Sequence, residues 1–464
     1  MRKLNRVGVS IFLSVLPIAA VADGMPAGSE DIDSCVITVN NAHNVELLTT
    51  YTDHTDGAWN AVFSHDGSML ATCGEDGKVL IHVLSDPDSV IQFIGHTEWV
   101  LGLAFSPDDQ FLASTGTYGF SGTQPGVIKI WDVATANQVR ELPGHDKGSW
   151  NLDFQESTDV LASCGKDKSV KLWDISSGDL LDSLAGHTNW VLCVDFHPNQ
   201  NLVASSSIDR SIRIWDSQTG EQVRLLSGHT NNVGFVKFSP DGLYLASGAD
   251  DQTVRLWDVA DGTPIWTVSG GQGWINCVNF SPDGELLLTC GHNGSVVLRK
   301  TTDGTELVRL TDHTGPVLRG SFNPRGTLFA TASWDNTVRV WGISNLVDTD
   351  VDGVADGCDN CVEEHNPGQE DCDGDGIGDI CDCECGIKGD VDDTGMATPL
   401  DVLFLVNYVY KSLDGRLYPI CWNCPVELGD FDCSGGLPNP VDVVYLVNAV
   451  YKSQNVICDG CGTL

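Results

Sequence analysis

Residues 186–216 read GHTNWVLCVDFHPNQNLVASSSIDRSIRIWD and contain one nearly complete unit of the pattern that decides the fold. Three short apolar runs, VLCVDF, LVASSS and SIRIW, are separated by turn-forming residues, which predicts three β-strands. A fourth strand is expected at residues 221–226, after the turn SQTG. The unit opens with Gly-His and its third strand closes with Trp-Asp.

The same unit recurs along the chain. If its His is taken as a marker, each step between markers is 42 residues except the second, which is 49, and a Phe follows every marker by nine residues. The marker positions are His54, His96, His145, His187, His229, Gly271 and His313. Four strands per unit, this period and the Gly-His to Trp-Asp signature resemble the WD-repeat family, whose fold is the β-propeller. The resemblance covers roughly residues 45–343 and implies an all-β propeller of seven blades.

The two ends of this region fit a closed ring. The last repeat stops after its third strand, at Trp341, and a strand without a partner, residues 45–51, precedes the first marker. In WD-repeat propellers the N-terminal strand commonly completes the last blade. Closure of that kind removes exposed strand edges.

The signature residues have a structural explanation. In WD-repeat blades the marker His, a Ser or Thr on the second strand, the turn Asp and the Trp form a buried set in which every polar group has a partner. By resemblance the complete sets are His145, Ser163, Asp167 and Trp173; His187, Ser205, Asp209 and Trp215; His229, Ser247, Asp251 and Trp257; and His313, Thr331, Asp335 and Trp341. Because the same residues recur in blade after blade, they indicate a scaffold and not a catalytic triad.

Three blades depart from that pattern. His82 takes the Trp position in the first blade, and the segment YGFSGTQPG, which begins at Tyr118, replaces the Asp turn of the second. The sixth blade has Gly271, Asn293 and Arg299 where His, Asp and Trp are expected. We expect these three blades to be softer than the others.

Six tryptophans occupy positions that the buried sets do not use. They stand three residues after a marker, five residues after one, or directly before a turn Asp; respectively they are Trp99, Trp190 and Trp274; Trp59 and Trp150; and Trp334. In the WD-repeat family these positions surround the mouth of the central channel, where partners usually bind. Such a surface suits a peptide, through amphipathic anchors, or a glycan, through stacking on a pyranose ring. The alternative is that several rings fold inward and fill the channel. We expect the insertion at residues 118–125 to contribute to the same rim.

Residues 1–22, MRKLNRVGVSIFLSVLPIAAVA, have the pattern of a secretory signal peptide: a basic start, an apolar stretch and a small-residue cleavage site. The alternative is a membrane anchor, but the stretch is short for a span. No other segment is apolar for long enough to cross a bilayer. The sequence therefore predicts a secreted or cell-surface protein without a transmembrane segment after signal cleavage.

Charge and cysteine are concentrated at the C-terminal end. The chain has 64 acidic and 25 basic residues, a formal charge of −39, which argues against binding nucleic acid through basic patches. From Ser344 onward there are 24 acidic and 4 basic residues, and 11 of the 17 cysteines. In an exported protein this composition points to calcium sites and disulfides, although spacing does not determine which cysteines pair.

Residues 348–382 contain two copies of the pattern D-x-D-x-D-G-x-x-D. Alternate carboxylates can converge on one hard cation while the Gly allows a tight turn. The CDNC and NPGQ motifs make this connector resemble thrombospondin type 3 repeats, which implies Ca2+ as the ligand; the alternative is a solvated acidic linker without metal. The predicted ligands are Asp348, Asp350, Asp352 and Asp356 in the first copy, and Asp371, Asp373, Asp375 and Asp379 in the second.

Residues 386–464 contain two related segments, GDVDDTGMATPLDVLFLVNYVYKS and GDFDCSGGLPNPVDVVYLVNAVYKS, each an acidic loop leading into a helix-period apolar pattern. Tandem loop–helix units of this kind resemble type I dockerin domains, which use the loop half of an EF-hand. The resemblance implies a small α-helical module with Ca2+ ligands Asp390, Asp392, Thr394, Met396 and Asp401 in the first loop, and Asp430, Asp432, Ser434 and Asp442 in the second. One inserted residue in the second loop leaves its calcium binding open. The recognition positions before the helices, Pro399-Leu400 and Asn439-Pro440-Val441, do not match the usual dockerin pairs.

Together these patterns predict an exported, non-enzymatic protein of three parts: a propeller that binds a protein, peptide or glycan, an irregular calcium-bound connector, and a dockerin-like tail. The tail would attach the chain to a cohesin-like partner or surface protein. One rival is a hydrolase role in an extracellular polysaccharide-degrading complex, which would need paired carboxylates or a metal cluster at the channel mouth. The other is a purely structural surface protein.

Overall fold

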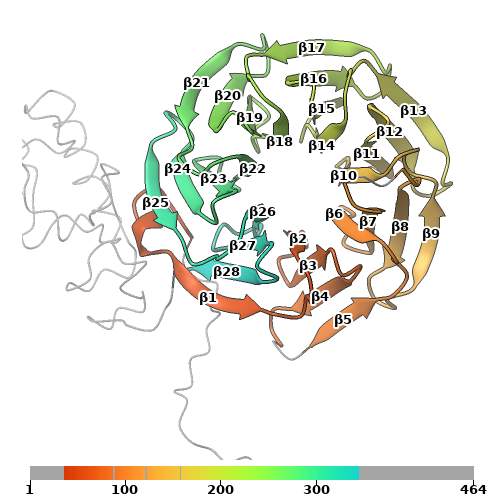
Figure 1. Cartoon of the computed structure of the whole chain (residues 1–464), viewed down its shortest axis with the longest axis horizontal. Coiled ribbons are helices and arrows are strands. Elements are labelled where there is room, and N and C mark those ends of the chain that lie inside the picture. Colours follow the sequence, from red (N-terminus) through yellow and green to blue (C-terminus); the bar gives the residue numbers. More distant parts are fainter. Residues whose placement is uncertain (1–35, 87–88, 121–122, 157, 344–464) are drawn as a thin grey trace, which may run out of the picture. The chain divides into compact units, whose positions relative to one another are not determined.

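The computed structural model describes residues 36–343, apart from 87–88, 121–122 and 157. In this part of the chain, 28 strands form seven antiparallel sheets of four strands, arranged as blades around a common axis (Figure 1). The all-β, seven-bladed propeller implied by the repeats is therefore confirmed.

In blades 1 to 6 the strands follow in chain order from the axis outward, and the blades are numbered by their repeats. Blades 1 to 3 contain β2 (Ala58–Phe63), β3 (Met69–Gly74), β4 (Val79–Val83) and β5 (Val90–Phe93); β6 (Trp99–Phe105), β7 (Phe111–Thr117), β8 (Val127–Asp132) and β9 (Gln138–Leu142); and β10 (Ser149–Phe154), β11 (Val160–Gly165), β12 (Ser169–Asp174) and β13 (Leu180–Ala185). Blades 4 and 5 contain β14 (Val191–Phe196), β15 (Leu202–Ser207), β16 (Ser211–Asp216) and β17 (Gln222–Ser227); and β18 (Val233–Phe238), β19 (Tyr244–Ala249), β20 (Thr253–Asp258) and β21 (Pro264–Ser269). Blade 6 contains β22 (Ile275–Phe280), β23 (Leu286–Gly291), β24 (Val296–Lys300) and β25 (Glu306–Leu310).

Blade 7 is assembled from both ends of the described region. Its inner strands are β26 (Val317–Phe322), β27 (Leu328–Ser333) and β28 (Val338–Gly342), and its outer strand is β1 (Glu46–Tyr51). Strand β1 pairs antiparallel with β28, from Glu46 opposite Gly342 to Tyr51 opposite Val338. The predicted closure of the ring by the N-terminal strand is thus observed.

Burial follows the distance of a strand from the axis. In blade 4, all but one residue of β14 is buried, whereas β17 is exposed except at Leu226 and Arg224. The inner strands pack against the neighbouring blades, which explains why they are apolar on both faces while the outer strands alternate. Five buried free cysteines, Cys73, Cys164, Cys193, Cys277 and Cys290, belong to this core.

Every innermost strand carries a β-bulge near its start. The strand pairing skips one residue, five positions after the marker, in all seven blades; the skipped residues are Trp59, Leu101, Trp150, Leu192, Gly234, Asn276 and Leu318. A bulge bends the strand and re-aims the side chain of its extra residue. The bulge therefore determines the direction in which the side chains of Trp59 and Trp150 point.

The four complete signature sets form the predicted hydrogen bonds. In blade 4, His187 Nδ1 lies 2.9 Å from Asp209, its Nε2 lies 2.8 Å from Ser205 Oγ, and the indole of Trp215 donates to the same oxygen at 2.8 Å. Blades 3, 5 and 7 repeat these contacts. Each set ties the marker loop, the second strand, the turn and the third strand together.

Blade 2 lacks the turn Asp, as the sequence indicates, but its marker histidine keeps an acidic partner. The insertion does remove the turn Asp, but Glu98 supplies a carboxylate from the marker's own loop, 2.7 Å from His96 Nδ1, while His96 Nε2 lies 2.7 Å from Ser114 Oγ. Burial alone would raise the pKa of Glu98, but its bonds from His96 and Thr97 lower that pKa to about 2. Glu98 therefore remains ionised and partners the histidine.

Blade 6 lacks the marker histidine, as the sequence indicates, but an adjacent residue takes over its role. Gly271 stands at the marker position, but the neighbouring Gln272 replaces the histidine: its amide donates to the Thr289 and Ser295 carbonyls at 3.0 and 3.1 Å, and it accepts from Thr289 Oγ1 at 2.8 Å. Arg299, at the Trp position, donates to the Gly270 carbonyl at 3.0 Å. That blades 1, 2 and 6 are softer stays a prediction.

The described residues contain one helix, the three-residue 3-10 turn η1 (Ala42–Asn44). None of their helices has the length and hydropathy needed to cross a membrane.

Candidate aromatic binding site

The six tryptophans singled out from the sequence differ in burial. Trp59 and Trp150, the bulge residues, are each only 5% exposed. Trp274 and Trp334 are 47% and 36% exposed. Trp59 and Trp150 fold inward, which was one sequence-based alternative, and Trp274 and Trp334 face solvent, which was the other. Trp99 and Trp190 are half-buried.

All six belong to one connected cluster of rings. Trp59 and Trp150, from blades 1 and 3, approach each other to 6.3 Å between ring centroids, and Trp150 stacks on Trp190 at 6.2 Å. Trp59 contacts Trp334 at 5.9 Å. Two residues that the sequence reasoning did not single out, Phe120 and His292, complete the connections.

Phe120 is the centre of this cluster. It comes from the insertion after β7, and its ring lies 5.5 to 6.4 Å from four of the tryptophans, Trp59, Trp99, Trp150 and Trp334. The predicted contribution of the insertion to the rim is therefore confirmed for Phe120. We call these six tryptophans, Phe120 and His292 the Trp mouth.

His292 extends the cluster to blade 6. Its ring lies 4.5 Å from that of Trp274 and 5.9 Å from that of Trp334. Offset or edge-to-face pairs of this kind contribute about 0.5–1.5 kcal/mol each beyond their buried area.

Lys166 holds Phe120 in place. Its ammonium donates to the carbonyls of Gly119 and Phe120 at 2.6 and 2.9 Å. The same nitrogen lies 5.6 Å and 5.1 Å from the ring centroids of Trp150 and Trp190, within reach of cation–π attraction. Burial lowers the pKa of Lys166.

Two carboxylates stand beside the rings. Glu75 accepts from the Trp334 indole at 3.0 Å, and Asp250 accepts from Asn232 at 2.8 Å. Burial raises the pKa of both carboxyls. Glu75, Lys166, Asp250, His292 and Trp334 all directly precede a turn Asp or its Asn replacement. This shared register is the signal by which His292 and Lys166 could have been found.

Two buried polar atoms in the Trp mouth have no partner among the described residues. The indole nitrogens of Trp59 and Trp150 are buried and make no hydrogen bond within the described part of the chain. A buried donor without an acceptor costs about 1–3 kcal/mol.

The predicted calcium ligands, from Asp348 to Asp442, lie outside the described residues, as do the connector, the dockerin-like module and residues 1–22. Within residues 36–343, excluding the gaps, no cluster of three His, Cys, Asp or Glu side chains could hold a metal ion.

Comparison with known proteins agrees with the fold. Residues 150–352 match the family described as "IFT122 first beta-propeller", and residues 45–82 and 88–132 match the family described as "WD domain, G-beta repeat". The described part of the chain is therefore a seven-bladed WD40-repeat β-propeller. WD-repeat propellers mediate interactions between proteins and are generally non-catalytic scaffolds.

Three relatives show how local the similarity is. A probable cytosolic iron-sulfur protein assembly protein CIAO1 homolog from Caenorhabditis elegans is 30% identical over 126 residues, which are 25% of this chain and 36% of that protein. A WD repeat-containing protein SL1-17 from Schistosoma mansoni is 30% identical over 160 residues, 34% of this chain and 50% of that protein. Protein HIR1 from Cryptococcus neoformans is 28% identical over 144 residues, 27% of this chain and 15% of that protein. The chain thus matches half or less of each of these relatives.

Proposed function

We propose that this propeller is a non-enzymatic binding protein that takes a protein partner at the Trp mouth. The observation that carries the proposal is the exposure of Trp274 and Trp334 at the edge of a ring cluster that continues inward to Trp59 and Trp150. Large aromatic side chains with a buried base and an exposed edge dominate the energy of protein interfaces.

The partner is an extended peptide segment with an apolar anchor. Its side chain packs on the exposed indoles, and its backbone carbonyls supply acceptors of the type that Trp59 Nε1 and Trp150 Nε1 lack. A purely apolar ligand would leave both donors unsatisfied. Sugar hydroxyls can also accept, so a glycan is the competing outcome of the test.

We also propose that the chain is exported and attached outside the cytoplasm through its C-terminal segment. The support for this part is the residue pattern alone: the basic-apolar start of residues 1–22, the two D-x-D-x-D-G-x-x-D copies, and the tandem loop–helix units of residues 386–464. In this proposal Ca2+ orders the acidic loops, and the tail binds a cohesin-like or surface protein.

The test is affinity capture with the full chain from surface extracts. The informative variant is Trp274→Ala with Trp334→Ala. The matched control is Leu181→Ala with Leu225→Ala, two side chains that are 53% and 50% exposed on the outer strands β13 and β17. We expect the first pair to lose a captured protein that the control retains.

Two further arms separate the alternatives. Adding chelator removes proteins held by a calcium-dependent tail but keeps those held at the Trp mouth. A glycan array shows whether the Trp mouth prefers a sugar. Retention of every captured protein by the Trp274→Ala, Trp334→Ala chain would contradict the proposed function.

A further inference from the structure

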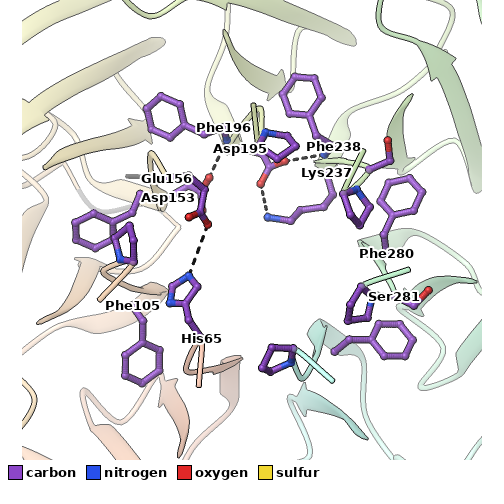
Figure 2. Close-up of a pocket in the computed structure, with 18 of the residues that line it drawn as sticks. His65, Phe105, Asp153, Glu156, Asp195, Phe196, Lys237, Phe238, Phe280 and Ser281 are labelled. Atoms are coloured by element: carbon purple, nitrogen blue, oxygen red, sulfur yellow. Dashed lines mark hydrogen bonds and ion pairs between the residues drawn. The ribbon is translucent and has the colours of Figure 1, made fainter. Parts of the chain in front are cut away.

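A cavity of about 280 Å³, drawn in Figure 2, is lined by residues from the ends of the innermost strands opposite to those that carry the Trp mouth. Trp99 is the first residue of β6 and Phe105, which lines the cavity, is the last. This strand has seven residues, which separates its ends by roughly 20 Å, so the two sites are distinct. A ring of phenylalanines lines the cavity, one at the end of the innermost strand of each of blades 2 to 7. In five of these blades a proline follows two residues later, and we call the site the Phe–Pro cavity.

Three charged side chains from adjacent blades face this cavity. Asp153, Asp195 and Lys237 stand on β10, β14 and β18, each eight residues after the marker. The equivalent residues of blades 1 and 2 are Val62 and Ala104. The charges are therefore not part of the general blade pattern and are confined to one side of the ring.

The three side chains are held in fixed positions. Asp153 accepts from the Phe196 amide at 2.7 Å, and Asp195 accepts from the Phe238 amide at 2.7 Å, so each carboxylate is tied to the next blade. The second oxygen of Asp195 forms an ion pair with Lys237. The second oxygen of Asp153 has no hydrogen-bond partner in the described structure.

The carboxylates in the cavity lining outnumber the permanently charged basic groups. Lys237 is the only basic group in the lining that is permanently charged, and its ammonium is paired with Asp195. Burial raises the pKa of Asp153 to about 7, an effect that Lys237 reduces and Asp195 increases. Burial also disfavours the charged form of Lys237, but the two carboxylates outweigh it and raise its pKa. Asp153 is thus a partly buried carboxylate without an ion-pair partner among the described residues.

The rim adds further acid and is open to solvent. Glu156 and His65, at the two lining positions where Pro is replaced, face each other at 3.9 Å, and their side chains are 55% and 43% exposed. Aromatic walls suit a cation as well, because a charged group is attracted to a ring face. Deeper along the same strands, the guanidinium of Arg319 already lies 4.6 Å from the ring centroid of Phe235.

From this arrangement we propose that the Phe–Pro cavity binds an alkyl chain ending in a cationic group, an arginine or lysine side chain of a partner, with Asp153 as its counterion. The volume is slightly below the roughly 300–1,000 Å³ of sites for drug-sized molecules, so it suits one extended side chain. The alkyl stem of the ligand would contact the Phe and Pro side chains around the cavity. Its cationic end would reach the oxygen of Asp153 that has no hydrogen-bond partner. This site is independent of the Trp mouth.

The test is calorimetric titration of the full chain with three capped pentapeptides, Gly-Ala-Xaa-Ala-Gly, in which Xaa is arginine, norleucine or glutamate. We expect saturable one-to-one binding of the arginine peptide and none of the other two. N-butylguanidinium, which has the alkyl stem and the charge but no peptide backbone, shows which part of the ligand is recognised. If it binds as tightly as the peptide, the alkylguanidinium group suffices. If it binds more weakly, the peptide backbone contributes. Either result supports the cation site.

Variants locate the site. Asp153→Asn keeps an acceptor for the Phe196 amide but removes the charge, and should weaken binding roughly tenfold or more, while Asp159→Asn, at an exposed carboxyl of the same blade, should not change it. Lys237→Met removes the competing cation and should strengthen binding, which keeps the test decisive if Asp153→Asn fails to fold. Equal binding of the arginine and norleucine peptides, or unchanged binding by Asp153→Asn, would overturn the proposal.

Discussion

Trp334 donates its indole N–H to Glu75 at 3.0 Å and thereby joins the last blade to the first. A second bond crosses the same seam, from Ser321 Oγ to the Ala61 carbonyl at 2.9 Å. On the outside, β1 pairs with β28. The ring is thus closed at two radii, and Trp334 takes part both in closure and in the Trp mouth.

Disrupting β1 should open the ring. Prolines at Thr49 and Thr50 remove two consecutive backbone donors, at least one of which faces β28, because donors alternate along an antiparallel strand. We expect the double proline variant to lose about 1–3 kcal/mol of unfolding free energy for each β28 carbonyl left without a donor, measured by urea denaturation. The control, Val at both positions, keeps β-branched side chains and should be near wild type. Equal stability of the two variants would show that β1 does not hold the ring closed.

A pair of neighbouring serines tests the signature sets. Ser205 and Ser206 are both fully buried, but Ser205 Oγ contacts His187 and Trp215 at 2.8 Å, whereas Ser206 Oγ has no partner among the described residues. Ser205→Ala leaves two buried polar groups unsatisfied and should cost about 1–3 kcal/mol. Ser206→Ala removes an unpaired hydroxyl and should be neutral or stabilising. The reverse order in thermal denaturation would contradict the structural role of the set.

His82 should make the propeller sensitive to mild acid. It replaces the Trp of blade 1 and stacks on Tyr51 at 4.0 Å, and burial lowers its pKa to about 4. Because the folded-state pKa lies below the unfolded value of about 6.5, folding favours neutral His82. Its contribution is therefore complete above pH 6.5 and is lost as the pH falls towards 4, by about 3 kcal/mol.

The substitution His82→Phe isolates this effect, since the other buried histidines are common to both proteins. We expect a flatter dependence of unfolding free energy on pH between 6.5 and 4. His43→Gln, at an exposed histidine, should keep the wild-type profile. If His82→Phe had the wild-type slope, burial of His82 would not be the cause.

Calcium uptake tests the proposed tail. We expect the full chain to bind Ca2+ with a saturable heat signal in calorimetric titration, and to lose this signal with chelator. Asp350→Asn with Asp373→Asn should reduce the stoichiometry, because each removes a carboxylate from one of the two repeated loops. If the chain takes up no calcium at millimolar concentration, the proposal that Ca2+ orders the tail for attachment is wrong.

The repeats predicted most of the fold, because each blade repeats the same local rules. Marker, strand and turn positions can be counted from His187 and Trp215, and the missing last strand is resolved by pairing residues 45–51 with the final blade. Residues that conform to the repeat were therefore predictable together with their hydrogen bonds.

Replacements from a different register position were not predictable. Glu98 reaches His96 from the marker's own loop, and Gln272 acts from one residue beyond the marker. The repeat pattern compares equivalent positions, so it cannot reveal a partner that arrives from a non-equivalent one. Three-dimensional proximity was needed to find both.

The bulges limited what the sequence could predict about the Trp mouth and the Phe–Pro cavity. One extra residue per innermost strand breaks the alternation of faces, so the sequence did not indicate that Trp59 turns inward or that Asp153 faces a cavity. Phe120 was accessible only as part of an insertion without a repeat equivalent. The tryptophan positions could be predicted, but not their division into buried and exposed rings.

The central claim, that the Trp mouth is the surface on which a protein partner binds, is tested most directly by oxidative footprinting of the full chain with a captured partner. Hydroxyl radicals modify exposed indoles, and Trp274 and Trp334 are the exposed tryptophans of the cluster. We predict that the partner protects both while exposed Leu181 and Leu225 on the outer strands react as in the free chain. Unchanged modification of Trp274 and Trp334 in a saturated complex would contradict the account.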